Sequence, residues 1–391
     1  IKVLDNTESV SIPKVSNNEW SLKGKSVCIL ADTGSKLNVY AAGSGQLVKT
    51  IDVVAGKNKT LREAYNELLI SFNENYDLLV RAYDEGIAYR FITRLDGEII
   101  INSEDAVFNF TSTPTIYFPE CDTNYSGEKD QQGKVHQIHQ GYRNFERLYK
   151  TYNAPTDITN NRFSVSPVLF SYPDTPYKIV VTESDTYDYP GLYMEQNGVN
   201  SMRGKWAQYP KEVMDSDPSN SSYWYSNHLV ISRENYIAKT EGSRTFPWRV
   251  IIVSDDDKSL LNNELVYMLA EPCRLTDTSW IQPGKSAWEW WHKAVLEGVD
   301  FPSGNKQLSL QLYKYYVDWA SKNHIEYMTL DAGWSEDYIK ELCSYAKERN
   351  VKIIVWTWLV APERIQATGS PKCTATVYRE QRSTFSNGMI R

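Results

Sequence analysis

The feature that most constrains the fold is a change of pattern near residue 270. From Ile1 to about Leu269, short stretches of alternating apolar and polar residues are broken by Gly, Pro, Asn and Asp, which is typical of an all-β region. After residue 285, stretches with helical periodicity separate short and nearly unbroken apolar segments. A chain of 391 residues is long for one hydrophobic core. We therefore expect two domains built on different principles.

The first region predicts a large β-sandwich. Its clearest element is the stretch Asp77 to Phe91, in which two segments with a period of two flank the turn-forming residues Asp84, Glu85 and Gly86, so we expect a hairpin. Many short strands over about 270 residues fit a sandwich of two packed sheets. Further strands are expected at Leu68–Phe72, Ile99–Asn102, Thr115–Phe118, Val165–Phe170, Lys178–Thr182, His228–Ser232 and Arg249–Val253.

The second region predicts parallel strands joined by helices. Expected strands at Ala287–Trp291, Ile325–Asp331 and Val351–Trp358 alternate with a helix over Lys306–Asn323 and a second helix capped by Ser335. Short connections imply right-handed crossovers, and apolar strands imply burial on both faces. A (β/α) barrel and an open doubly wound sheet both satisfy this order. The residues at the strand ends favour the barrel.

The domain limits follow from these patterns. We expect a sandwich domain over residues 1–270, a linker over 271–285 with two prolines and a glycine, and the first three strands of a (β/α)8 barrel over 286–391. Residues 122–140 are polar and patternless and predict a long loop. From about residue 362 the helical period is lost, which predicts an irregular tail and leaves open a nonfunctional reading frame.

Composition excludes several functions. The net charge of −7, without a basic block, argues against a nucleic acid partner. No apolar run reaches the roughly 18 residues that a membrane span needs. Zinc spacing, a G-x-S-x-G turn and a phosphate-binding glycine loop are all missing from the sequence. The chain opens at Ile1 without a secretory signal pattern, so we expect its true N-terminus to lie upstream and cannot assign a compartment from the residues.

Acid and tryptophan at the expected strand ends indicate carbohydrate binding. Most of the 12 tryptophans lie between Trp280 and Trp358. Indole rings stack on the apolar faces of sugars while carboxylates bind hydroxyls. Asp331, Trp334 and Trp291 are therefore candidate substrate-binding residues at the carboxyl ends of barrel strands. The alternatives are that Asp331 accepts a hydrogen bond from the next helix and that the tryptophans belong to the core.

A second candidate site is the acidic turn in VTESDTYDYPGLYM, residues Val181 to Met194. Glu183 and Asp188 lie where a strand runs into a turn, and such oxygens suit calcium. From composition alone, a solvated turn explains the same residues.

Taken in order along the chain, several segments resemble glycoside hydrolase family 97, which contains bacterial α-glucosidases and α-galactosidases. The resemblance runs from about Arg62 to Trp358 and implies a β-super-sandwich followed by the opening of a catalytic (β/α)8 barrel. The segments are REAYNELL, VRAYDEGIAYRF, VTESDTYDYPGLY, FPWRVIIV, EPCRLTDTSWIQPGKSAWEWW and IEYMTLDAGW.

The same resemblance implies calcium as cofactor, with Glu183 as the ligand from the first domain and the remaining ligands on later barrel loops. It also places the catalytic acid and the base or nucleophile beyond the third strand, so no catalytic residue is assigned and the fragment is expected to be inactive. The expected substrate is an oligosaccharide or other α-linked glucoside or galactoside, and family relatives suggest a periplasmic or secreted protein. The alternative is a carbohydrate-binding β-sandwich module without catalytic activity. Sugar preference and stereochemical outcome stay open.

Overall fold

The computed structural model describes residues 2–4, 26–28, 37–40, 47–72, 75–121, 128–129, 135–136, 146–160, 162–215 and 228–356. The chain divides into two compact units, Ile1–Thr276 and Asp277–Arg391. The division falls within the range 271–285 that the sequence suggests as a linker, and no helix or strand lies in that range. The expected tail from residue 362 and most of the expected loop at 122–140 lie outside the described residues.

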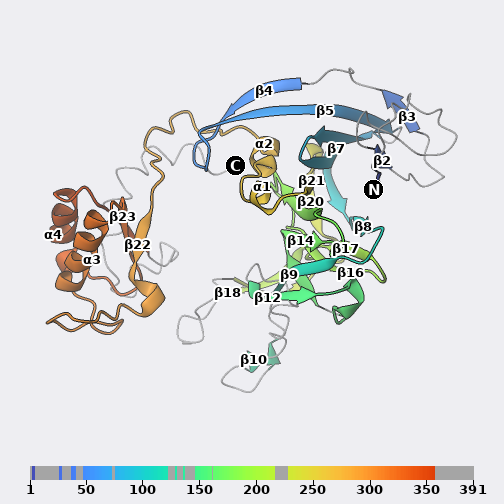
Figure 1. The fold of residues 1–391 in the computed structure, drawn as a ribbon. Helices are drawn as coiled ribbons and strands as arrows, with labels where there is room; N and C mark the ends of the chain where they lie inside the picture. Colours follow the sequence, from blue (N-terminus) through green and yellow to red (C-terminus); the bar gives the residue numbers. More distant parts are fainter. Residues whose placement is uncertain are drawn as a thin grey trace. The chain divides into compact units, whose positions relative to one another are not determined.

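The first unit is built almost entirely from antiparallel strands (Figure 1). The strands are β1 Lys2–Leu4, β2 Ser26–Cys28, β3 Leu37–Tyr40, β4 Leu47–Asp52, β5 Thr60–Phe72, β6 Tyr76–Tyr83, β7 Gly86–Ile101, β8 Val107–Asn109, β9 Thr115–Cys121, β10 Glu128–Lys129, β11 Val135–His136, β12 Glu146–Tyr152, β13 Phe163–Val165, β14 Val168–Ser171, β15 Lys178–Ser184, β16 Tyr193–Gln196, β17 Ser201–Lys205, β18 Pro210–Asp215, β19 His228–Arg233, β20 Ala238–Thr245 and β21 Trp248–Ser254.

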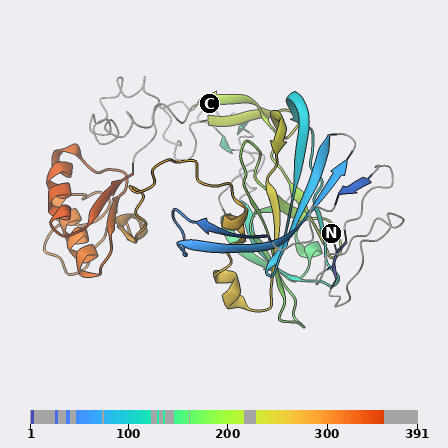
Figure 2. The ribbon, with the colours of Figure 1, turned by 90° about the horizontal axis from the view of Figure 1, so that it is seen from above.

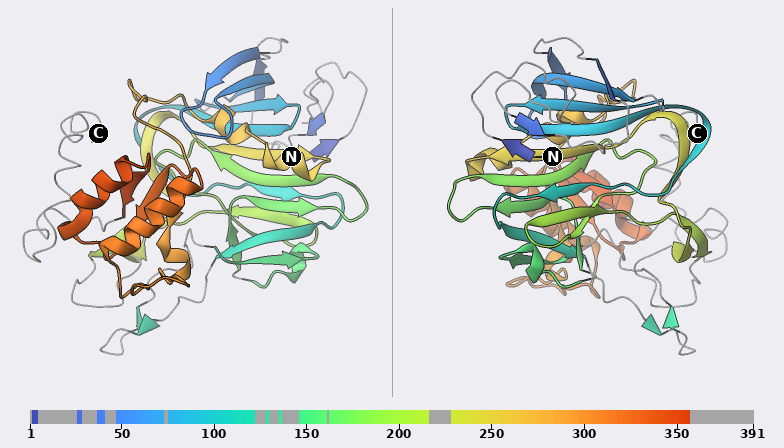
Figure 3. Two further views of the ribbon diagram at one scale, coloured as in Figure 1. Left: turned by 60° about the vertical axis from the view of Figure 1, so that its left-hand side comes forward. Right: turned by 90° about the vertical axis from the view of Figure 1, so that its right-hand side faces the viewer.

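Most of these strands form one sheet of 15 strands, whose main path runs β3-β5-β6-β7-β21-β15-β14-β9-β13-β16-β17-β8. The predicted hairpin is confirmed, since β6 pairs with β7 in the register Tyr83↔Gly86. Gly86 is required there because a Cβ would collide with the carbonyl oxygen of Ile251 on β21. The long β7 curves so that its first half pairs with β6 and β21 and its second half with β20 (Figure 3).

The main core of this unit joins strands that are far apart in the pairing order. Phe108 on β8 and Met202 on β17 are buried with Phe170 on β14, Val181 on β15 and Ile251 on β21. The sheet must therefore fold over on itself around this core, as the faces of a sandwich do. A second core packs Trp248 against two short helices that the sequence did not predict, α1 Asp257–Leu261 and α2 Leu265–Leu269.

One expected strand in the first unit is divided. The prediction of a single strand over Val165–Phe170 was wrong in detail, because β13 ends at Val165 and β14 starts at Val168 on the other side of a cis Ser166–Pro167 bond. Proline cannot donate a ladder hydrogen bond, so it ends the pairing there. A short 3-10 helix, η3 Pro155–Asp157, completes the elements of this unit.

The second unit contains three parallel strands, β22 Ser286–Trp288, β23 Tyr327–Leu330 and β24 Lys352–Val355, in the order β22-β23-β24. The connecting helices α3 Leu310–Lys322 and α4 Glu336–Lys347 lie on one face of this sheet (Figure 2). Their buried faces share one core with the strands. None of the helices in the described part of the chain has the length and apolar character needed to span a bilayer.

Helix caps in the second unit follow the sequence signals. Ser335 caps α4 by accepting a hydrogen bond from the Asp337 backbone N–H, as predicted. Helix α3 starts four residues later than expected, because Ser309 caps it by accepting from the Leu312 N–H. The expected strand at Ala287–Trp291 was too long: β22 ends at Trp288 and the chain turns into the 3-10 helix η4 Glu289–His292.

Candidate functional site

The carboxyl ends of the parallel strands in the second unit bring an acid and several tryptophans together. Trp288 ends β22, pairs with Thr329 on β23 and thus lies beside the residue that follows β23, Asp331. The Trp288 indole Nε1–H donates to Oδ2 of Asp331 at 3.0 Å, and the Ala332 N–H donates to Oδ1 at 2.6 Å. Each carboxylate oxygen can accept a second hydrogen bond. The Asp331 carboxylate is therefore fixed in place and can still accept hydrogen bonds from the hydroxyls of a ligand.

Three indoles form a cluster next to this carboxylate. The Trp288 and Trp290 rings stack with centroids 5.4 Å apart and an angle of 16° between their planes. Trp291 meets both rings edge-on, at 5.5 and 5.6 Å. Trp290 is 57% exposed and Trp291 is 74% exposed, so large apolar faces are open. Such faces are the usual partners of a sugar ring.

Trp291, one of the predicted residues, lies in η4 and not at the end of a strand as expected. It still joins the Asp331 neighbourhood, because Trp288 contacts both. The third predicted residue, Trp334, lies just before α4, where its Nε1–H donates to the Trp356 carbonyl at 3.0 Å and its ring packs on the core of the unit. That substrate-binding role stays a prediction for all three residues.

Glu289, which the sequence reasoning missed, is the buried acid of this site. It is 2% exposed, and its Oε1 accepts from the Asp331 N–H at 2.9 Å and from the Tyr313 hydroxyl at 3.1 Å. Burial raises the pKa of the Glu289 carboxyl above its usual range, and these two donors partly offset the rise. The signal in the sequence was an ionisable residue inside the aromatic run WEWW.

In the first unit, Glu183 lies at the end of β15 in a buried ion cluster. Its Oε2 accepts from Nη1 of Arg249 at 2.8 Å and its Oε1 accepts from the Leu192 N–H at 2.8 Å. Arg249, 1% exposed, donates to both oxygens of Glu104 at 2.7 Å. Burial raises the pKa of the Glu183 carboxyl, while the Arg249 charge works in the opposite direction.

The surroundings of Glu183 do not by themselves form a calcium site. Calcium takes six to eight oxygen ligands, whereas both Glu183 oxygens already accept hydrogen bonds and Glu104 is held at both oxygens by Arg249. Asp188 is exposed, and its Oδ2 accepts from the Thr240 hydroxyl at 2.7 Å. In the described ranges, no group of three His, Cys, Asp or Glu side chains is placed to hold a metal ion.

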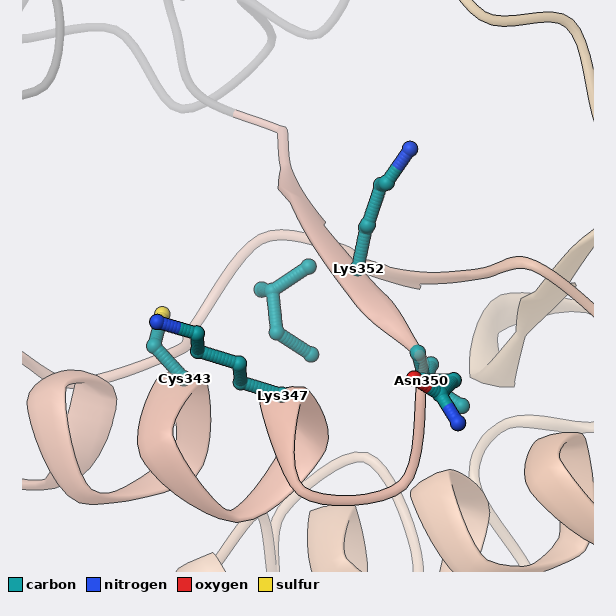
Figure 4. A pocket seen from close by; sticks show the side chains of 6 residues that line it. Cys343, Lys347, Asn350 and Lys352 are labelled. Carbon is teal, nitrogen blue, oxygen red and sulfur yellow. The ribbon is translucent and has the colours of Figure 1, made fainter.

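A hollow of about 470 Å³ lies elsewhere in the second unit (Figure 4). It is lined by Cys343, Lys347, Asn350, Val351, Lys352 and Ile353, from the end of α4 and the start of β24. These residues lie at the amino end of the strand, whereas working groups of barrel proteins gather at the carboxyl ends. The hollow therefore lies at the amino ends of the strands, and Asp331 lies at their carboxyl ends.

Fold and sequence together define a class: an antiparallel β unit followed by a parallel strand–helix unit with an acid and exposed indoles at its strand ends. Sequence models described as Glycosyl-hydrolase 97 N-terminal and Glycoside hydrolase 97 match residues 15–272 and 290–379. The chain belongs to glycoside hydrolase family 97.

Individual relatives agree with this family. The chain is 33% identical over 365 residues to a retaining alpha-galactosidase of Bacteroides thetaiotaomicron, covering 89% of this chain and 52% of that protein. It is 27% identical over 300 residues to a probable retaining alpha-galactosidase of Streptomyces bingchenggensis, covering 72% of this chain and 37% of that protein. The chain thus spans about half, or less, of the length of these relatives.

Solved structures share the fold. A family 97 enzyme from Pseudoalteromonas sp. strain K8, in complex with acarbose, superposes with a TM-score of 0.57 at 19% identity, over 82% of this chain and 45% of that one. A beta-arabinopyranosidase superposes with a TM-score of 0.52 at 17% identity, over 84% of this chain and 47% of that one.

Proposed function

We propose that this chain forms the saccharide-binding part of a retaining α-galactosidase. The observation that carries the proposal is the 33% identity over 365 residues to a retaining alpha-galactosidase, together with an acid and open indole faces at the strand ends of the second unit. The likeness favours α-galactosides over the α-glucosides that the sequence left open. It also favours continuation of the three parallel strands into a (β/α)8 barrel in a protein of the relatives' length.

The residues of this chain contribute binding and orientation. Asp331 offers its remaining acceptor capacity to sugar hydroxyls, and its Oδ2 is fixed by the Trp288 indole. The exposed faces of Trp290 and Trp291 cover the apolar face of the sugar and exclude water from it. Retention requires a nucleophilic carboxylate and an acid–base carboxyl about 5 Å apart. We assign neither role here, because the resemblance places both on later strands.

Calcium dependence is a further part of the proposal. It is supported by the match of VTESDTYDYPGLY to the family and by the position of Glu183 at the end of β15. Each Glu183 oxygen accepts one hydrogen bond and can still offer its other acceptor position to a cation, and the resemblance implies that the remaining ligands lie on later barrel loops. Export to the periplasm is likewise proposed from the resemblance alone.

Hydrolysis assays test the proposal. The gene product of full length, incubated with p-nitrophenyl α-galactoside and α-glucoside, should release p-nitrophenol from the galactoside. Binding of methyl α-galactoside without turnover of either substrate would favour the alternative, a carbohydrate-binding module. Absence of both binding and turnover would contradict the proposed function.

A further inference from the structure

Glu289 links three elements around the strand-end site. It opens η4 directly after β22, and its Oε1 accepts from the backbone N–H of Asp331, which directly follows β23, at 2.9 Å. The same oxygen accepts from the hydroxyl of Tyr313 on α3 at 3.1 Å. One carboxyl oxygen thus ties the start of η4 to the end of β23 and to the helix that covers the sheet.

Burying the Glu289 carboxyl in the core lowers the stability of the fold. Glu289 is 2% exposed, and its second oxygen, Oε2, accepts no hydrogen bond from another described residue. Burying a carboxyl whose second oxygen has no hydrogen-bond donor from a neighbouring residue is destabilising, and an apolar side chain of similar volume would avoid that cost. An acid retained at such a cost points to a task other than packing.

The hydrogen bonds of Glu289 indicate its role. Glu289 accepts from the backbone N–H of Asp331, and the Asp331 side chain accepts from the Trp288 indole at 3.0 Å. Backbone and side chain of Asp331 are therefore fixed by the two consecutive residues Trp288 and Glu289. The next two residues, Trp290 and Trp291, present the open indole faces. After His292, Lys293 and Ala294 adopt left-handed φ angles of 57° and 56°, so the backbone of this segment is itself constrained.

We propose that Glu289 is a positioning residue of the saccharide site, which sets the place of Asp331 relative to the indole cluster by gripping the Asp331 backbone N–H. The inference rests on the proposed function, because it assigns Glu289 a role in the sugar binding suggested there. Glu289 itself does not touch the sugar.

This role depends on the length of the Glu289 side chain and not on its charge. Two variants of the 391-residue chain separate the effect of length from the effect of charge. Glu289→Gln keeps the length of the side chain and an oxygen that accepts from Asp331. Glu289→Asp keeps the carboxylate but withdraws it by one methylene. Tyr313→Phe is the control, because it removes the other donor to Oε1 and leaves the Asp331 contact in place.

Three measurements are made on each variant: the affinity for methyl α-galactoside from tryptophan fluorescence, hydrogen exchange of the Asp331 amide, and the melting temperature. We expect Glu289→Asp to weaken binding about tenfold, as loss of one directing hydrogen bond does, and to speed exchange at Asp331. Glu289→Gln and Tyr313→Phe should bind within about twofold of the unmodified chain. A residue with a merely structural role would change the melting temperature but not the affinity of the folded protein.

Two results would overturn the inference: unchanged affinity and unchanged Asp331 exchange in Glu289→Asp, or equal losses in Glu289→Gln and Glu289→Asp. If the unmodified chain binds no methyl α-galactoside, the proposed function fails at that point. The exchange rate of the Asp331 amide then still decides whether Glu289 holds that residue in place.

Discussion

Replacing Arg249 with methionine tests how the first unit holds Glu183. The guanidinium is 1% exposed and makes three hydrogen bonds of 2.7–2.8 Å to Glu104 and Glu183. Removing one partner of a buried ion network leaves charge without compensation, which typically costs about 3–5 kcal/mol. Methionine retains apolar contact with the neighbouring rings of Trp206 and Tyr189. The loss should therefore come from electrostatics more than from a cavity.

The pH dependence of this loss has a defined sign. Burial already raises the pKa of Glu183 above its usual value of 4.5, and Arg249 holds it down in part, so removing Arg249 raises it further. A carboxyl with a raised pKa favours the folded state below its unfolded value and loses that contribution as pH rises through the folded value. The stability deficit of Arg249→Met should thus be largest near pH 7 and shrink as the pH falls toward about 4.5.

Urea unfolding at pH 5 and pH 7, followed by far-ultraviolet circular dichroism, measures the deficit. The double variant Arg249→Met/Glu183→Gln should regain more than about 1 kcal/mol at pH 7, because it also removes one of the two carboxylate charges that lose their partner, while Glu104 keeps the other. The matched control is Arg203→Met, which breaks a surface pair with Glu195 and should cost less than about 1 kcal/mol. If Arg249→Met costs no more than the control, or if its deficit is the same at both pH values, the Arg249 network does not stabilise the first unit through buried charge.

Three further outcomes follow from individual contacts. Ser335→Ala removes the side-chain cap of α4 and should lower the free energy of unfolding by about 1 kcal/mol in urea titrations. Tyr83→Phe removes the 2.6 Å hydrogen bond to the fully buried Glu63 and should cost about 1–3 kcal/mol by the same measurement. The hydrogen bond from Arg94 lowers the pKa of Asp77, so this pair stabilises the fold above pH 3.8 and its contribution is lost on acidification. In thermal melts at several pH values, Arg94→Met should lose less stability than the unmodified chain as the pH falls below 3.8.

Local periodicity predicted the elements that depend on local sequence. The hairpin of β6 and β7 follows from alternation on both sides of a short turn, and α4 follows from Ser335 and one apolar face. The succession of three parallel strands and two helices along the chain also agrees with the prediction. By contrast, α1 and α2 were missed because each is only five residues long, too short for a helical period to stand out. Their position depends on tertiary packing against Trp248, which no local pattern encodes.

The candidate site shows where sequence reasoning reaches its limit. The sequence predicted an acid and indoles at the strand ends as Asp331, Trp334 and Trp291, whereas the indole that contacts Asp331 in the structure belongs to Trp288. The sequence did not predict that β22 ends at Trp288, because the end of this strand depends on contacts with residues distant in sequence. Glu289 accepts hydrogen bonds from donors 24 and 42 residues away, at Tyr313 and Asp331. Directly after Glu289, Trp290 and Trp291 lie in η4 and are exposed. A buried acid and an open aromatic surface thus follow one another within four residues, and the reach of the acid is the quantity that the Glu289 variants measure.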